Sequence, residues 1–195
     1  RALRIWEHHL GEEHPDVATA VNNLGGALQA LGDLAGAKAA FERALRIDEA
    51  VYGREHPDVA RDVNNLGGAL KDLGDLAGAK AAFERALRIW ERHLGEEHPN
   101  VATAVSNLGG ALWELGDLAG AKVAFERALR ICEASLGPEH PNTKTARLNL
   151  MGVTLMSRPG CSGWFFRLLA ALERRIPPEK RAQMAAQLRQ SLQKK

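Results

Sequence analysis

The chain contains few aromatic residues and few cysteines. Only 5% of its 195 residues are Phe, Trp or Tyr, and its two cysteines, Cys132 and Cys161, lie in unlike contexts. This predicts free thiols and argues against a disulfide framework. No apolar run approaches the roughly 20 residues that a membrane-spanning helix needs, and no signal-peptide pattern opens the sequence. We therefore expect a soluble, cytoplasmic protein with a core of Leu, Ala and Val.

Motifs of catalysis and cofactor binding are missing too. The sequence has no Gly-x-Ser-x-Gly, no His-Glu-x-x-His and no Walker-type loop. His14, His56, His98 and His140 recur at one spacing, which in stacked helices would keep them about 10 Å apart. A zinc ion needs ligands about 2 Å away, so each His is expected at a helix start beside its Pro. The sequence predicts no enzyme, no cofactor, no metal site and no small-molecule substrate.

Internal repetition is the dominant feature that is present. The segment from His14 to Ile47 returns nearly unchanged at 56–89 and at 98–131, and it begins a fourth time at His140. Such a fixed period predicts a tandem array. We divide the chain into a second-helix remnant (1–13), three repeats (14–55, 56–97 and 98–139), a partial, degenerate repeat (140–157) and a basic C-terminal segment (158–195).

Each repeat predicts two amphipathic helices, because its apolar residues step by three or four. In the first half these are Val17, Val21, Leu24, Leu28 and Leu31. In the second half they are Leu34, Ala37, Phe41, Ala44 and Leu45.

The boundaries of these helices are marked by residues with known end preferences. Pro15 suits the first position of a helix, where a missing N–H costs nothing. Asp33 is expected to cap the start of the second helix, and Gly53 to close it in a left-handed conformation. The same residues recur in each later repeat.

The spacing Val21, Leu24-Gly25, Leu28, Ala37 and Phe41 recurs in phase in all three repeats. This pattern resembles the tetratricopeptide repeat, and the Asn-Asn-Leu and His-Pro-x-Val-Ala strings resemble the 42-residue repeats of kinesin light chains and their bacterial relatives. The resemblance implies an all-α, right-handed α-solenoid of tandem helix-turn-helix repeats. Gly25 and Ala37 are then expected where two helices approach closely.

The pattern is lost at both ends of the chain. Arg1 falls inside a second helix, which predicts at least one further repeat upstream in a longer parent chain. Met151 replaces the glycine of Leu-Gly, and residues 158–195 contain nine Lys or Arg against two Glu, a net charge of +7. Two helices are expected there, capping the last apolar face. Capping is favoured over nucleic acid or a membrane surface, and Trp164-Phe165-Phe166 is an alternative contact for a partner.

The resemblance also implies a site: a concave groove lined by the first helices, which holds an extended peptide. Family members place polar residues on these helices, and the matching asparagine ladder is Asn23, Asn65, Asn107 and Asn149. One turn earlier, where peptide-clamping members often have Lys or Arg, the column reads Thr19, Arg61, Thr103 and Thr145. Copy-to-copy variation adds Asn22, Asn64, Lys71 and an exposed Trp113 as candidates. The alternative is that the ladder only bonds neighbouring repeats and fixes their stacking.

We therefore expect a scaffold or adaptor that binds an extended peptide or a partner helix. The alternative is a sensor or regulatory arm of a larger signalling NTPase or protease, because similar arrays are often attached to such modules. Its partners would then include upstream domains of the same parent chain.

Overall fold

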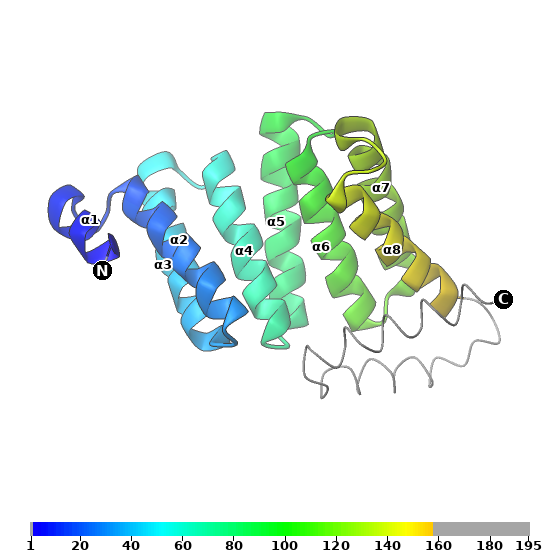
Figure 1. The fold of residues 1–195 in the computed structure, drawn as a ribbon, viewed down its shortest axis with the longest axis horizontal. Coiled ribbons are helices and arrows are strands. Elements are labelled where there is room, and N and C mark those ends of the chain that lie inside the picture. Colours follow the sequence, from blue (N-terminus) through cyan, green and yellow to red (C-terminus); the bar gives the residue numbers. More distant parts are fainter. Residues whose placement is uncertain (1, 158–195) are drawn as a thin grey trace. The chain divides into compact units, whose positions relative to one another are not determined.

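The computed structural model describes residues 2–157. The chain divides into two compact units, Arg1–Thr154 and Leu155–Lys195, and the description below concerns the first. The predicted capping helices and the Trp164-Phe165-Phe166 cluster lie outside the described residues. Within residues 2–157 there are eight α-helices and no strand, which confirms the predicted all-α solenoid of tandem helix pairs (Figure 1).

The helices alternate between first and second helices of successive repeats. The first helices are α2 (Pro15–Ala30), α4 (Pro57–Asp72), α6 (Pro99–Leu115) and α8 (Pro141–Met156). The second helices are α1 (Ala2–Leu10), α3 (Leu34–Tyr52), α5 (Leu76–Leu94) and α7 (Leu118–Leu136). The first helices α2, α4 and α6 each pack on the second helix of their own repeat and on that of the preceding repeat, as with α4 between α5 and α3.

Side chains cap the helix starts as the sequence predicts. The His14 Nδ1 atom accepts a hydrogen bond from the Asp16 amide at 3.1 Å, and Pro15 occupies the first turn of α2. The Asp33 carboxylate accepts from the Gly36 amide at 2.9 Å at the start of α3. Both caps satisfy amide groups that have no partner inside the helix. The His caps recur at His56, His98 and His140, and the Asp caps at Asp75 and Asp117.

The ends of the second helices differ in detail from the prediction. Gly53 has φ 82° and ψ 163°, so its φ is positive as expected, but its ψ lies outside the left-handed helical region. Only glycine adopts this combination readily, which explains its place in the pattern. Gly116 at the end of α6 is in the left-handed helical conformation, with φ 89° and ψ 2°.

In each of the three complete repeats, a phenylalanine of the second helix packs on a glycine of the first helix. Phe41 of α3 is buried beside Ala37 and Ala69, and a Cβ atom added to Gly25 would lie 2.7 Å from the Phe41 Cε1 atom. Gly67 and Phe83 repeat this contact, as do Gly109 and Phe125. The prediction of small residues at the close approach of two helices is thus confirmed.

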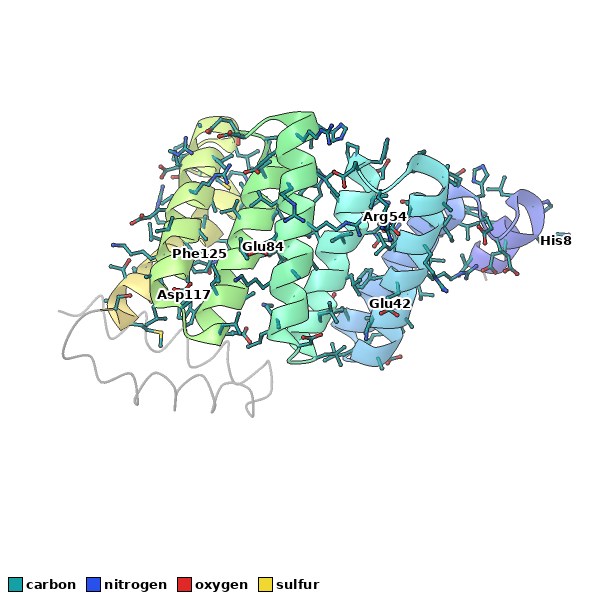
Figure 2. All side chains as sticks on the ribbon, turned by 180° about the vertical axis from the view of Figure 1, so that it is seen from behind. His8, Glu42, Arg54, Glu84, Asp117 and Phe125 are labelled. Atoms are coloured by element: carbon teal, nitrogen blue, oxygen red, sulfur yellow. The ribbon has the colours of Figure 1, made fainter. Side chains whose placement is uncertain are left out.

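Neighbouring second helices are tied together by one repeated ion pair. Arg85 of α5 contacts Glu49 of α3 at 2.6 Å. The equivalent pairs are Arg43–Glu7 at 2.7 Å and Arg127–Glu91 at 2.6 Å. Figure 2 shows the second helices side by side, with Glu42 labelled on α3 and Glu84 on α5. We call these three pairs the arginine–glutamate series.

Candidate functional site

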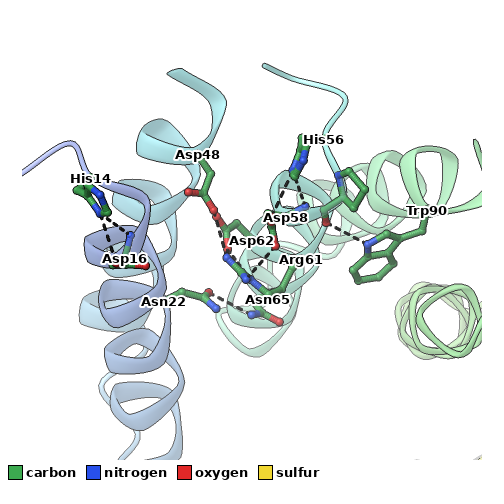
Figure 3. A network of polar contacts seen from close by, with 11 residues as sticks. His14, Asp16, Asn22, Asp48, His56, Asp58, Arg61, Asp62, Asn65 and Trp90 are labelled. Carbon is green, nitrogen blue, oxygen red and sulfur yellow. Dashed lines mark hydrogen bonds and ion pairs between the residues drawn. The ribbon is translucent and has the colours of Figure 1, made fainter. Parts of the chain in front are cut away.

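The asparagine ladder joins adjacent first helices. The Asn65 carboxamide of α4 donates a hydrogen bond to the Asn22 side-chain oxygen of α2 at 3.1 Å (Figure 3). Asn107 donates to Asn64 at 3.0 Å in the same way. Asn149 of α8 repeats the contact with the Ser106 hydroxyl of α6 at 3.4 Å. The ladder therefore makes the contacts between repeats that the alternative interpretation expected.

Asn22 and Asn64, which the sequence analysis placed in the groove, are each only 7% exposed. Their side chains face the next first helix, and each accepts a hydrogen bond from the ladder asparagine of that helix. A step of one residue turns about 100° around a helix, so they lie on a different side from Asn23, which is exposed. The exposed side of the first helices, which we call the open face, therefore contains the ladder and not the column formed by Asn22 and Asn64.

The ladder asparagines keep unused hydrogen-bonding capacity. A carboxamide has two N–H donors and an oxygen that can accept twice. The bond from Asn107 to Asn64 uses one of these donors, and Asn107 itself remains partly exposed. Fixing the stacking of repeats and contacting a peptide are therefore compatible roles for this column.

The Thr column lies one turn earlier on the same face. Thr19 and Thr103 are exposed. The Thr103 hydroxyl donates to the Pro99 carbonyl of its own helix at 3.1 Å, and Thr145 does the same with Pro141 at 3.0 Å. Their methyl groups and remaining oxygen lone pairs make this part of the face neutral.

Arg61 stands in the Thr column, but three aspartates surround its guanidinium group. The Arg61 Nη2 atom lies 3.1 Å from the Asp48 carboxylate, Nη1 lies 3.2 Å from Asp58, and Nε donates to Asp62 at 3.2 Å (Figure 3). Asp48 and Asp62 are fully buried, whereas Arg61 is 35% exposed on its side chain. Its positive charge is therefore matched within the protein before any peptide carboxylate arrives.

Asp48 and Asp62, the buried partners of Arg61, are not among the site residues that the sequence predicts. Burial raises the pKa of Asp62 to about 8; Arg61 opposes the shift, and the hydrogen bond and charge of Asp48 add to it. Burial also raises the pKa of Asp48. The available signal was that both positions depart from the other repeats together with Arg61, since Asp62 replaces Ala20 and Ala104.

Late in each first helix, variable residues meet across the boundary between repeats. Gln29 of α2 donates to Asp72 of α4 at 2.6 Å. One repeat later, Lys71 lies 3.9 Å from Glu114. The two variable columns are therefore partners of each other, and Lys71 is directed along the array.

Trp113, expected to be exposed, is partly buried instead. Its ring packs edge-on against Phe125 with 6.2 Å between centroids. A Cβ atom at Gly152 of α8 would lie 2.7 Å from the indole. The absence of a side chain at Gly152 makes room for this ring, which explains the difference from the prediction. Trp113 presents only part of its surface to a partner.

A second column of glycines leaves positions on the open face without side chains. Gly26 and Gly110 follow the ladder residues Asn23 and Asn107 by one turn, and a Cβ atom at either position would meet nothing within 4 Å. Glycine inside a helix costs roughly 0.5–1 kcal/mol relative to alanine. Gly25 is required by Phe41, but packing gives no such reason for Gly26 or Gly110. Open space therefore adjoins the helix backbone at both positions.

Two features are absent from the part of the chain that the structure describes. Among residues 2–157, no group of three or more His, Cys, Asp or Glu side chains is placed to hold a metal ion. Over the same residues, no helix has the length and apolar character needed to cross a membrane.

Comparison with known proteins gives one family. The tetratricopeptide repeat model matches residues 1–50, 16–84, 62–133 and 101–150. No curated protein matches the chain.

Similar solved structures include other repeat arrays. BtubC (BKLC) from P. vanneervenii is 27% identical with a TM-score of 0.70, over 90% of this chain and 72% of that chain. Nearly identical TPR-like repeats of a Podosopora anserina protein, described as a kinesin light chain, are 24% identical with a TM-score of 0.63, over 77% of this chain and 72% of that chain. The first TPR of Spaghetti (RPAP3), bound to the HSP90 peptide SRMEEVD, shares the fold at 18% identity and a TM-score of 0.53, over 72% of this chain and 93% of that chain.

Proposed function

Because this chain belongs to the tetratricopeptide repeat family, whose repeats are generally protein–protein interaction modules, we propose that it is a non-catalytic scaffold or adaptor. It holds an extended peptide or a partner helix along the open face of its first helices. That face consists of Thr19 and Thr103, the ladder residues Asn23, Asn65 and Asn107, and the glycines Gly26, Gly68 and Gly110.

The observation that supports this proposal most directly is the empty space above Gly26 and Gly110. Both glycines weaken their helices without serving the packing, and both adjoin an asparagine that can donate to or accept from a peptide backbone. Close approach of another backbone is a recognised use of glycine. The spacing of these positions by one repeat suits a ligand that contacts several repeats in succession.

The chemistry of the face favours a ligand held by its backbone and by apolar side chains. Thr and Asn carry no charge, and the charge of Arg61 is matched by its aspartates. Lys71 is likewise directed to Glu114. We therefore propose sequence-tolerant binding, in contrast to a clamp for a free carboxylate. Of the Spaghetti (RPAP3) structure, only the fold carries over to this chain.

The test fills the empty space without disturbing the core. Peptides are selected from a displayed library on the wild-type chain and measured again on Gly26→Gln/Gly110→Gln, which places two long side chains on the open face. The matched control is Ala39→Gln/Ala81→Gln on the second helices, because both alanines are exposed and the equivalent Val123 shows that the column accepts a larger residue.

Loss of binding in the glycine variant, with retention in the control, would support the proposed face. Circular dichroism checks that both variants remain helical. If the glycine variant binds as well as the wild type while the control loses binding, the site lies on the second helices and the proposal is wrong.

A further inference from the structure

The contact between α3 and α4 differs in charge from every equivalent contact in the described array. Asp48 occupies a position that holds Trp6, Trp90 or Cys132 elsewhere. Asp62 replaces an alanine and Arg61 replaces a threonine. These three exceptions to the repeated template contact one another in space. Because two of the three side chains are buried and Arg61 contacts both, they form one charged cluster in place of the apolar residues at the equivalent junctions.

The buried carboxyl groups leave one oxygen each without a donor. Asp48 Oδ2 and Asp62 Oδ1 contact Arg61 at 3.1 and 3.2 Å. Asp48 Oδ1 and Asp62 Oδ2 are buried and have no hydrogen-bond donor. Both carboxyl groups contact the same atom, Arg61 Nη2, so the two side chains are close neighbours. Two neighbouring carboxyl groups can bond to each other only if one of them holds a proton.

We propose that the α3/α4 junction is a proton-operated joint, in which Asp48 and Asp62 share one proton while α4 is packed on α3. While the pair holds the proton, it carries one negative charge, which the Arg61 guanidinium balances. When the proton passes to solvent, two buried carboxylates face one guanidinium. An unmatched buried charge is strongly unfavourable, so the junction loosens there and not at its neighbours.

Burial, more than any neighbouring charge, favours holding the proton on Asp62. Burial raises the pKa of this carboxyl to about 8, against Arg61, and Asp48 raises it further by its hydrogen bond and charge. At the start of α4, the charge of Asp58 raises the pKa of Asp48 and the capping His56 lowers it.

The next residue on α3, Glu49, faces Arg85 of α5 and Arg54. These contacts direct the charge of Glu49 away from the pair.

The direction of the pH effect follows from this shift. An Asp62 carboxyl in the unfolded chain has a pKa of 3.8, and in the folded protein of about 8. The folded state therefore binds more protons between these values, and its stability falls as the pH rises from about 4 to about 8. Below and above this window both states bind the same number of protons, and the pH dependence disappears.

Loosening this junction would also affect the proposed binding face. The hydrogen bond from Asn65 to Asn22 bridges the same pair of repeats. We therefore expect the Asn23 end of the ladder to separate from the rest when the proton is lost, while the Asn107 to Asn64 bond persists.

The shared proton can be measured directly by carbon NMR of aspartate carboxyl groups in the full chain. We expect one aspartate signal to titrate near pH 8 in the wild type and to be missing in Asp62→Asn, whose amide donates permanently to Asp48. Ordinary aspartates titrate near pH 4. If every aspartate of the wild type is ionised by about pH 6, the proposal is overturned.

The loosening is tested by hydrogen exchange, corrected for intrinsic rates, on the first turns of α4 and α6. Between about pH 7 and pH 9, protection of α4 should fall roughly tenfold relative to α6 in the wild type. It should stay level in Asp62→Asn and in Asp48→Trp/Arg61→Thr/Asp62→Ala, which copies the α5/α6 junction and so keeps a packing the chain already uses. An equal fall in either variant, or no fall in the wild type, would overturn the proposal.

Discussion

The α3/α4 and α5/α6 junctions share two kinds of contact, which we call the frame. They differ in the residues that lie between these contacts, which we call the filling. Both have an asparagine contact between first helices and an arginine–glutamate pair between second helices. At α3/α4 the space between them holds Asp48, Arg61 and Asp62. At α5/α6 the same positions hold Trp90, Thr103 and Ala104, with Trp90 buried in an apolar cluster that includes Ala104.

This difference teaches that contacts common to all repeats set their stacking, whereas the variable residues set the properties of each junction. The indole N–H of Trp90 donates to the Pro57 carbonyl at 3.1 Å, so the apolar filling leaves no polar group of the ring unpaired. The charged filling leaves two oxygens dependent on a proton. A polar cluster of this kind is weak support for stability, but it makes one junction responsive.

The largest expected effect comes from removing Arg61, the cation that contacts both buried carboxyl groups. Arg61→Ala should lower the free energy of unfolding by about 3 kcal/mol, at the low end for a broken buried pair because Arg61 is 35% exposed. The matched change Thr103→Ala at the α5/α6 junction should stay within about 0.5 kcal/mol. Urea unfolding of the two variants measures both values. Equal losses would show that the two fillings do not differ as described.

Exchanging the fillings should reverse the order of the two junctions. Asp48→Trp/Arg61→Thr/Asp62→Ala gives α3/α4 the apolar set, and we expect a gain of about 2 kcal/mol at neutral pH, because well-packed apolar residues often replace a buried ion cluster favourably. Trp90→Asp/Thr103→Arg/Ala104→Asp should lose stability. Chemical denaturation decides the sign, and a graft that destabilises at every pH would mean that the junctions are not interchangeable.

The fold was predictable because its signals are local and repeated. The 42-residue period, the caps His14 and Asp33, and the pairing of Gly25 with Phe41 each depend on residue types at fixed spacing. The ψ value of Gly53 was not, since a glycine at a helix end allows more than one backbone conformation with positive φ.

The candidate site was only partly predictable, because periodicity places a residue on a helix but not against its neighbour. Asn22 and Asn23 are adjacent in sequence, yet one is buried in a contact between repeats and the other is exposed. Trp113 is covered because Gly152 leaves space for it in the following helix. Such contacts require knowledge of how repeats stack, which no single repeat contains.

Loss of the asparagine contact should lower the stability by the same amount at either junction. Asn65→Ala and Asn107→Ala each remove one side-chain hydrogen bond between first helices. We expect each change to lower the free energy of unfolding by about 1 kcal/mol. Thermal and urea unfolding of the pair test this equality, and a clear difference between them would show that the filling alters the frame.

The smallest effect is expected at the ends of the first helices, where the variable pairs are more open to solvent. Lys71→Gln replaces the charged partner of Glu114, now 3.9 Å away, by a neutral amide, as Gln29 provides for Asp72 at 2.6 Å. Because exposed ion pairs contribute little, stability should change by only about 0.3 kcal/mol, and the difference should shrink in high salt. A loss well above this, unchanged by salt, would mean that Lys71 supports the α4/α6 contact by packing and not by charge. The variable columns would then belong with the fillings as determinants of each junction.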